Sequence, residues 1–176
     1  KIKIDKIKNS NRKISVLNLF AYTGAATSAC LSADAEVCHV DAVKSMVLRA
    51  KDNVILNELQ KSRVRFITDD AKKFVLREIK RKHFYDAIIM DPPSYGRGPQ
   101  GELWKIEDEL YGLIEICLEL FTNNPLFFLI NSYTTGLSPS TINNLLEILL
   151  IKKVGGKINC SEIGLPITSN GLFFPC

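Results

Sequence analysis

The sequence has few of the features that define secreted, membrane-spanning or metal-binding proteins. Its longest uninterrupted apolar stretch, residues 126–130, has five residues, whereas a membrane-spanning helix needs about 18. The five cysteines are odd in number and include no C-x-x-C pair, so neither a disulfide framework nor a zinc site is predicted. Of the two histidines, His39 lies inside an expected strand and His83 in a basic turn, and neither belongs to a pattern typical of a metal site or a catalytic triad. We therefore expect a cytoplasmic protein without a membrane span or a bound metal.

The net charge of +4 is concentrated at the N-terminus. Residues 1–13 carry six cations and one anion, which leaves a net charge of −1 for the remainder. Within this remainder, residues 61–82 contain nine cations and three anions, while residues 102–119 are acidic. This polarity is compatible with RNA on one side of the protein. A solvated helix face explains residues 61–82 equally well.

Strand-like and helix-like segments alternate along the chain, which is typical of an α/β domain with a parallel sheet. The expected strands are residues 15–20, 36–41, 63–68, 84–90, 126–131 and 157–162, with a seventh beginning near Leu172. The expected helices are residues 25–33, 43–57, 70–81, 106–121 and 139–151, the last with Ser138 as N-cap and Pro139 at its first position. We expect one domain over residues 15–176, preceded by a basic segment, residues 1–14, that is the remnant of an upstream region. The chain starts at Lys1 and stops at Cys176 within the last expected strand, so we expect further sequence beyond both ends.

In open α/β sheets a ligand binds beside the carboxyl ends of the strands, so the loops that follow the strands are informative. The first such loop, residues 18–25, turns through Gly24, which permits close backbone approach just before a helix N-terminus. A dinucleotide site needs the three glycines of G-x-G-x-x-G, so NAD is disfavoured. A nucleoside with an amino-acid tail, whose carboxylate binds the turn amides, suits a single glycine better. An ordinary tight turn explains the loop about as well.

Acidic residues follow the second and third expected strands. Asp41 ends the second strand, where a carboxylate can accept hydrogen bonds from both ribose hydroxyls. Its alternative role is that of N-cap for the next helix. Asp69 and Asp70 follow the third strand, so one of them can cap a helix while the other accepts from an exocyclic amino group. We assign Asp70 to adenine and Asp69 to capping, with the reverse assignment nearly as well supported.

The strongest signal is residues 91–99, directly after the apolar strand. Pro92 and Pro93 fix the turn and remove two N–H donors, which leaves the Asp91 carboxylate and backbone carbonyls as acceptors. Tyr95 is available to stack on a planar group. Acceptors beside an aromatic ring suit the edge of a nucleobase. Trp104, farther along, either covers this pocket or anchors the start of a helix.

At these loops the sequence resembles class I S-adenosylmethionine-dependent methyltransferases, and more closely the bacterial group related to the large-subunit rRNA methyltransferases. The resemblance runs from about Val16 to the end and rests on residues 18–24, 40–42, 69–71, 91–99 and 131–139 in this order. It implies a Rossmann-like, mostly parallel seven-stranded sheet of order 3-2-1-4-5-7-6 with helices on both faces. The last strand would be antiparallel and truncated by the end of the chain.

The resemblance also implies which residues hold the cofactor S-adenosylmethionine. Residues 20–25 would lie along its methionine part, Asp41 at the ribose, Asp70 at the adenine and residues 91–93 beside the methyl group. The expected cofactor-binding residues are Asn18, Phe20, Tyr22, Thr23, Gly24, Ala25, Asp41, Ala42, Asp69, Asp70, Ala71 and Asp91. The expected catalytic residues are Asp91, Pro92, Pro93 and Tyr95.

One departure from the resemblance concerns the reaction. Relatives that methylate carbon 5 of cytosine use a cysteine that attacks the base, and the resemblance implies that this cysteine follows the fifth strand. This chain has Asn131, Ser132 and Tyr133 there. A nitrogen on a purine or an amino group is therefore favoured as methyl acceptor. Enzymes that methylate amino groups usually have the aromatic residue directly after the second proline, whereas in this chain Ser94 stands between Pro93 and Tyr95.

We expect a methyltransferase that acts on RNA, with ribosomal RNA as the first candidate. The bound RNA base would be turned out of its stack, held by Asp91 and the Pro92 carbonyl, and covered by Tyr95. The alternatives are a small-molecule or protein methyltransferase, which the nearly neutral body of the chain supports, and a cofactor-binding module that is inactive as this fragment.

Overall fold

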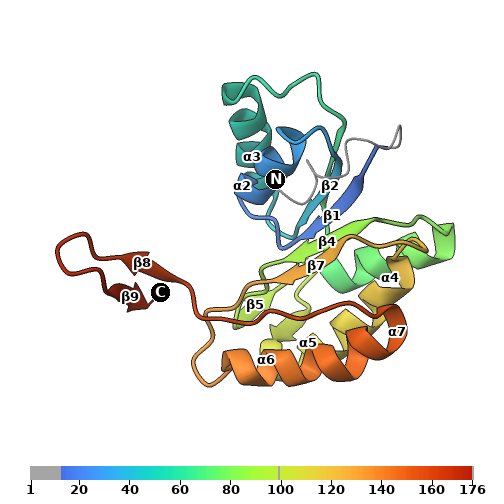
Figure 1. Ribbon diagram of the computed structural model, residues 1–176. Helices are drawn as coiled ribbons and strands as arrows, with labels where there is room; N and C mark the ends of the chain where they lie inside the picture. Colours follow the sequence, from blue (N-terminus) through green and yellow to red (C-terminus); the bar gives the residue numbers. More distant parts are fainter. Residues whose placement is uncertain (1–12, 99, 176) are drawn as a thin grey trace. The chain divides into compact units, whose positions relative to one another are not determined.

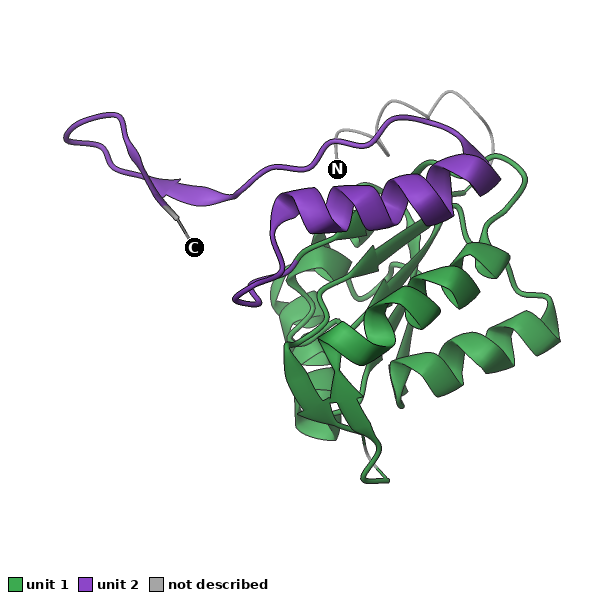
Figure 2. Ribbon diagram, turned by 90° about the horizontal axis from the view of Figure 1, so that it is seen from below, with its two compact units in different colours: residues 1–131 green, residues 132–176 purple. Residues whose placement is uncertain are grey.

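The computed structural model describes residues 13–98 and 100–175, and the chain divides into two compact units, residues 1–131 and 132–176 (Figure 2). The larger unit contains a five-stranded parallel sheet of order β3-β2-β1-β4-β7. Its strands are β1 (Ser15–Leu19), β2 (Glu36–Asp41), β3 (Val64–Thr68), β4 (Ala87–Met90) and β7 (Phe127–Ile130). Its helices are α2 (Ala25–Leu31), α3 (Lys44–Leu56), α4 (Ala71–Arg81), α5 (Ile106–Cys117) and the 3-10 turn η1 (Leu118–Leu120). The predicted α/β class is confirmed, whereas the prediction of a single domain over residues 15–176 stays a prediction.

Most of the predicted basic segment, residues 1–12, lies outside the described residues. Within the described ranges, no helix is long and apolar enough to cross a membrane.

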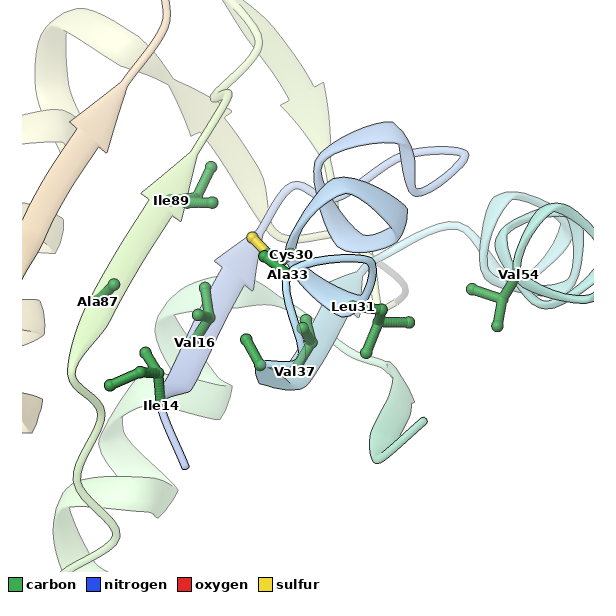
Figure 3. Packing of buried hydrophobic residues seen from close by; sticks show 10 residues of the cluster. Ile14, Val16, Cys30, Leu31, Ala33, Val37, Val54, Ala87 and Ile89 are labelled. Atoms are coloured by element: carbon green, nitrogen blue, oxygen red, sulfur yellow. The ribbon is translucent and has the colours of Figure 1, made fainter. Parts of the chain in front are cut away.

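Helices cover both faces of the sheet (Figure 1). Val16, Val37 and Ala87 stand side by side on β1, β2 and β4, and residues of α2 and α3 pack against them in one buried cluster (Figure 3). The next residue along each strand points to the opposite face, where α4 and α5 lie. Leu17 and Ile88 are fully buried there. Because β4 is buried on both faces, it has no polar position.

A short hairpin that was not predicted from the sequence follows β4. Its strands β5 (Tyr95–Arg97) and β6 (Leu103–Lys105) pair antiparallel, with Gly96 opposite Trp104. Three residues are too few for apolar and polar positions to alternate recognisably. The hairpin leads directly into α5, whose N-cap is Lys105. The region after β4 is therefore a folded element that carries both Tyr95 and Trp104.

The smaller unit differs from the predicted end of the sheet. Helical turns run through α6 (Pro139–Leu146), the π-helix η2 (Glu147–Ile151) and α7 (Lys152–Val154). Ser138 Oγ accepts from the Thr141 amide at 3.2 Å, which confirms the predicted start of this helix. The predicted strand 157–162 and the seven-stranded sheet are wrong: β8 (Gly164–Pro166) and β9 (Phe173–Pro175) form a separate antiparallel pair. Two glycines with positive φ, at 155 and 156, turn the chain before the predicted strand, and only Ile158 within it is partly covered.

Candidate active site

The parallel sheet brings the carboxyl ends of its strands to one edge. The chain leaves β1 at Phe20, β2 at Asp41, β3 at Asp69, β4 at Asp91 and β7 at Asn131. Three backbone hydrogen bonds join neighbouring exits, each at 3.0 Å: Ala21 N to Val40 O, Asp69 N to Asp41 O, and Asn131 N to Met90 O. This edge is where open α/β sheets bind their ligands, and the predicted site residues lie along it.

The loop after β1 has an unusual backbone conformation. The φ angles are 52° at Phe20, 48° at Tyr22 and 82° at Gly24. Residues other than glycine rarely adopt positive φ, and such strain persists only where the surroundings hold it. The Tyr22 amide donates to Asp41 Oδ2 at 2.8 Å, and Asn53 Nδ2 donates at 2.8 Å to the carbonyl before Gly24. Residues of β2 and α3 therefore fix the shape of this loop.

Gly24 is required for space as well as for conformation. A Cβ at this position would lie 2.9 Å from Ala50 Cβ and 3.6 Å from His39 Cε1. The glycine thus lets the start of α2 pack directly on α3. The amides of Tyr22 and Gly24 already donate within the protein, to Asp41 and Ala21 respectively. A ligand carboxylate, as predicted for this turn, would therefore have to bind other amides of the turn.

Asp41 does not cap the helix that follows it. Its Oδ1 accepts from the Val43 amide at 2.8 Å and its Oδ2 from the Tyr22 amide at 2.8 Å. The N-cap of α3 is Val43, and no side chain caps this helix. Each carboxylate oxygen has a second lone pair, so both can still accept a hydroxyl. The cap alternative is wrong, and the fixed carboxylate retains the acceptors that the ribose role needs.

Asp70, not Asp69, caps α4. Asp70 Oδ1 accepts from the Lys73 amide at 2.9 Å. Asp69 Oδ1 accepts from the Asp70 amide at 2.9 Å, and its Oδ2 pairs with Arg77. The assignment of capping to Asp69 is therefore wrong, because α4 begins at Ala71 and the cap is the residue before it. The contact between Asp70 and adenine stays a prediction that would use its other carboxylate oxygen, Oδ2.

Asp91 and Asn131 meet across the ends of β4 and β7. Asn131 Nδ2 donates to Asp91 Oδ1 at 3.1 Å, and Asp91 is exposed. Asn131, one of the three residues that follow the strand after which a cysteine is expected, therefore orients the predicted catalytic carboxylate. Pro92, between the carboxylate and the hairpin, is buried.

Trp104 links the loops after β1 and β4. Its Nε1 donates to the Pro93 carbonyl at 2.6 Å, and its ring centroid lies 5.0 Å from that of Phe20. The side chain is buried and stands just before α5. The Pro93 carbonyl is thus occupied, which leaves that of Pro92 for the predicted contact with substrate. Tyr95, on the same hairpin, is 55% exposed.

Comparisons with known proteins identify the family of this chain. Residues 4–116 match the family described as S-adenosylmethionine-dependent methyltransferase. The chain belongs to this family. The ribosomal RNA large subunit methyltransferase I of Citrobacter koseri is 40% identical over 81 residues, 46% of this chain and 20% of that protein. The protein of that name from Enterobacter sp. is 38% identical over 81 residues, so the match spans about a fifth of the curated relatives.

Solved structures extend the similarity to most of the methyltransferase chain. A SAM-dependent methyltransferase from Agrobacterium tumefaciens is 37% identical with a TM-score of 0.78, covering 82% of this chain and 46% of that one. SMU.776 in complex with SAH has a TM-score of 0.70 at 23% identity, covers 92% of this chain and 40% of that one, and shows the fold alone. The predicted fold class, enzyme class and cofactor, S-adenosylmethionine, are confirmed.

A buried polar network in the methyltransferase lies beneath the loop after β1. Asn18 Nδ2 donates to Thr27 Oγ1 at 3.0 Å, and Thr27 Oγ1 is 2.9 Å from His39 Nδ1. Burial lowers the pKa of His39 to about 4, so its imidazole is neutral at pH 7. Asn18 is only 3% exposed, and it ties β1 to α2 rather than facing the surface as the predicted cofactor contact requires. The sequence signal for the network is that Asn18 and His39 are polar residues within apolar strands, and the structure places them opposite each other on β1 and β2.

Three of the cysteines are buried in the core. Burial raises the pKa of Cys30 and Cys117, and raises that of Cys38 to about 11. Cys160 is exposed in the smaller unit, and Cys176 lies outside the described residues. Because the thiolate is the nucleophilic form, the three buried cysteines are unsuited to attack a base. In residues 13–98 and 100–175, no three His, Cys, Asp or Glu side chains gather as metal ligands.

Carboxylates neutralise most of the basic cluster in residues 61–82. Six of its nine cations form ion pairs: Arg63 with Glu36, Arg65 and Arg81 with Glu78, Lys72 with Glu109, Lys73 with Glu102, and Arg77 with Asp69. Glu78 is fully buried and also accepts from the Tyr85 hydroxyl at 2.6 Å. The cluster is therefore mainly a structural set of ion pairs rather than an open basic surface.

Proposed function

We propose that this methyltransferase acts on RNA, with ribosomal RNA as the first candidate, and that it methylates a nitrogen atom. The observation that supports RNA is the 38–40% identity to proteins named ribosomal RNA large subunit methyltransferase I. Those proteins are matched over about a fifth of their length, so their substrate enters here as our proposal. The free thiols of the larger unit support a cytoplasmic location, where such thiols stay reduced.

The residues at the carboxyl edge fit S-adenosylmethionine. We assign Asp41 to the ribose hydroxyls, because its oxygens are fixed and each has one acceptor position left. We assign Asp70 and Ala71 to the adenine, and the loop from Phe20 to Ala25, together with Ala42, to the remainder of the cofactor. When bound, the cofactor would supply the methyl group on its sulfonium sulfur, with the neutral thioether as leaving group.

Asp91 is placed to hold the methyl acceptor. Its carboxylate is exposed and oriented through Oδ1 by Asn131, so Oδ2 can accept from an N–H of the acceptor nitrogen. The Pro92 carbonyl is a second acceptor of the same kind. Transfer of the methyl group to the nitrogen would release one proton from that nitrogen, which Asp91 is placed to take. Positioning of this kind is the main requirement for an in-line displacement.

The choice of nitrogen over carbon 5 of a pyrimidine depends on the missing nucleophile. Carbon 5 becomes nucleophilic only after a thiolate adds to the ring. Asn131, Ser132 and Tyr133 stand where a cysteine is expected, Asn131 donates to Asp91, and the buried thiols have raised pKa values. A base nitrogen needs no such adduct.

Methyl transfer from tritiated S-adenosylmethionine tests the substrate class directly. The full-length protein would be incubated with an extract of cells that lack its gene, and the labelled product treated with ribonuclease or protease. Release of the label by ribonuclease alone, followed by mass spectrometry that places the methyl group on a nitrogen of an rRNA nucleoside, is the expected result. Label released by protease or present only in small molecules would overturn the RNA assignment. A covalent complex trapped on RNA that contains 5-fluorocytosine would overturn the nitrogen assignment.

The ion pairs of residues 61–82 favour one second candidate, a small-molecule or protein methyltransferase. Six of the nine cations expected to attract RNA are already paired. The same labelling experiment separates this candidate from the first.

A further inference from the structure

A surface pocket beside the loop after β4 brings Tyr95, which is expected to cover the substrate base, together with charged side chains that the proposed reaction does not use. The pocket has a volume of about 470 Å³ and is lined by Ser94, Tyr95, Lys105, Glu107 and Asp108. Sites for small ligands have volumes of about 300–1,000 Å³. Tyr95 and Lys105 are directly opposed across the hairpin, so their side chains share one face of it. The first turn of α5 supplies the two acids.

The charged groups of this pocket are unpaired. In the part of the chain that the structure describes, none of Lys105, Glu107 and Asp108 makes an ion pair. The next acid of α5 differs, because Glu109 binds Lys72 at 2.7 Å. Acids in a first helical turn favour the helix, which accounts for the two carboxylates. It does not account for an exposed aromatic ring and an unpaired ammonium group around the same pocket.

We propose that this pocket binds an unpaired RNA base that carries both an exocyclic amino group and a ring carbonyl, namely cytosine or guanine. The proposal rests on the RNA substrate proposed above. Ionised carboxylates only accept hydrogen bonds and an ammonium group only donates them. Glu107 and Asp108 therefore select the amino group, as carboxylates do at cytosine N4, while Lys105 donates to the carbonyl. The ring of Tyr95 stacks on the base, a common mode for unpaired RNA bases.

The other two bases match the pocket less well. Uracil has no amino group, and its single ring N–H on this edge lies between two carbonyl oxygens, so the carboxylates would also face those oxygens. Adenine has an amino group but offers Lys105 only a ring nitrogen in place of a carbonyl oxygen. Binding of single-stranded oligonucleotides to the full-length protein, saturated with S-adenosylhomocysteine, therefore measures the predicted preference.

Two matched pairs of labelled oligonucleotides of about ten nucleotides isolate the amino group. In the first pair, oligo(C) carries an amino group at position 4 of the ring where oligo(U) carries a carbonyl, and uracil also has an N3–H. In the second pair, alternating guanosine–adenosine and inosine–adenosine strands differ only by the guanine 2-amino group. We expect the amino-bearing member of at least one pair to bind about 3- to 10-fold more tightly by fluorescence anisotropy, the scale of one net hydrogen bond. Equal affinities within both pairs would overturn the pocket, even for a protein that methylates RNA.

Variants then locate the preference in the pocket. The double variant Glu107→Gln, Asp108→Asn should abolish the preference, and Tyr95→Ala should weaken binding of all strands about 5- to 150-fold, the range for a lost stacking partner. Tyr95→Phe should retain binding because the ring is kept. Glu115→Gln is the matched control, since it removes one charge from an exposed position of the same helix outside the pocket, and it should keep the preference.

The outcomes separate the pocket from the function. A preference that survives the double variant, with cofactor affinity intact, would overturn the pocket while leaving the RNA methyltransferase standing. A protein that binds no strand and labels no RNA would overturn both. The base preference is measured on the wild-type protein with the two oligonucleotide pairs. The proposal can therefore be refuted even if a variant fails to fold.

Discussion

Replacement of Gly24 by alanine tests how the loop after β1 is built. The change has two separate effects. The backbone at this position has φ of 82°, which disfavours an L-residue by about 1–2 kcal/mol. The new methyl group would also lie 2.9 Å from Ala50 Cβ, closer than packed carbon atoms approach, and such overpacking typically costs about 1–3 kcal/mol. We expect Gly24→Ala to lower the free energy of unfolding by about 2–5 kcal/mol.

The variant Ala50→Gly separates the two effects. Alone, it should destabilise the protein by about 1–2 kcal/mol, because it places glycine within α3 and removes a buried methyl group. Combined with Gly24→Ala, it removes the close contact but leaves the backbone strain. The double variant should therefore lose less stability than the two single variants together, by about 1–3 kcal/mol.

Urea denaturation followed by circular dichroism measures the unfolding free energies of the wild type, the two single variants and the double variant. Calorimetry with S-adenosylhomocysteine on the same samples shows whether the change in the loop also lowers affinity for the cofactor product, as we expect. Additive effects of the two substitutions, within about 0.5 kcal/mol, would show that the contact between Gly24 and Ala50 is not a constraint and would refute the steric part of the argument.

Three further predictions concern the residues around the loop. Asp41→Ala should weaken binding of S-adenosylhomocysteine by about 1–3 kcal/mol in calorimetry and also lower the melting temperature, because two backbone amides lose their acceptor; unchanged affinity would reject the ribose role. Trp104→Phe keeps a ring but leaves the Pro93 carbonyl without its donor, so urea denaturation should show a loss of about 1–3 kcal/mol, and no loss would contradict the link between the loops. Burial raises the pKa of Glu78, but hydrogen bonds from Tyr85 and Arg81 and nearby positive charges lower it more, to below its usual 4.5. Its contribution to stability is therefore complete above the unfolded pKa and lost as the pH falls through the lower folded pKa, so Glu78→Gln should flatten the decline of the urea midpoint below about pH 4.5, and a parallel decline would argue against this role.

The sheet of the larger unit could be predicted because its strands carry strong local signals. The unbroken apolar sequence of β4 indicates burial on both faces. Asp41 and Asp91 stand at or just after strand ends, at the edge where open α/β sheets bind their ligands. The start of α6 was equally clear, since Ser138 and Pro139 are an N-cap and a first helical residue that depend only on local backbone geometry. Signals of this kind need no knowledge of tertiary contacts.

The errors arise where a tertiary contact decides between local alternatives. Asp69 and Asp70 are adjacent acids, and the choice of cap depended on where α4 begins and on the pairing of Asp69 with Arg77. The predicted strand 157–162 has alternating residues but no buried face to match them. Trp104 offered two roles from sequence, and its contacts with Phe20 and the Pro93 carbonyl connect segments that are far apart in the chain.

The ion pairs also change where attraction to RNA can originate. Residues 61–82 supply nine cations in the sequence but six are held by carboxylates, and a paired cation gains less from a phosphate because it must give up its partner. The remaining sequence outside residues 1–13 has a net charge of −1. If RNA is the substrate, as we propose, phosphate attraction depends mainly on the six cations of residues 1–13, and the rest of the larger unit recognises RNA by stacking and hydrogen bonding. Such contacts discriminate between bases, whereas phosphate contacts only position the strand. This division of roles is why the unpaired Lys105, Glu107 and Asp108 beside an exposed Tyr95 are more informative about the substrate than the larger number of cations on α4.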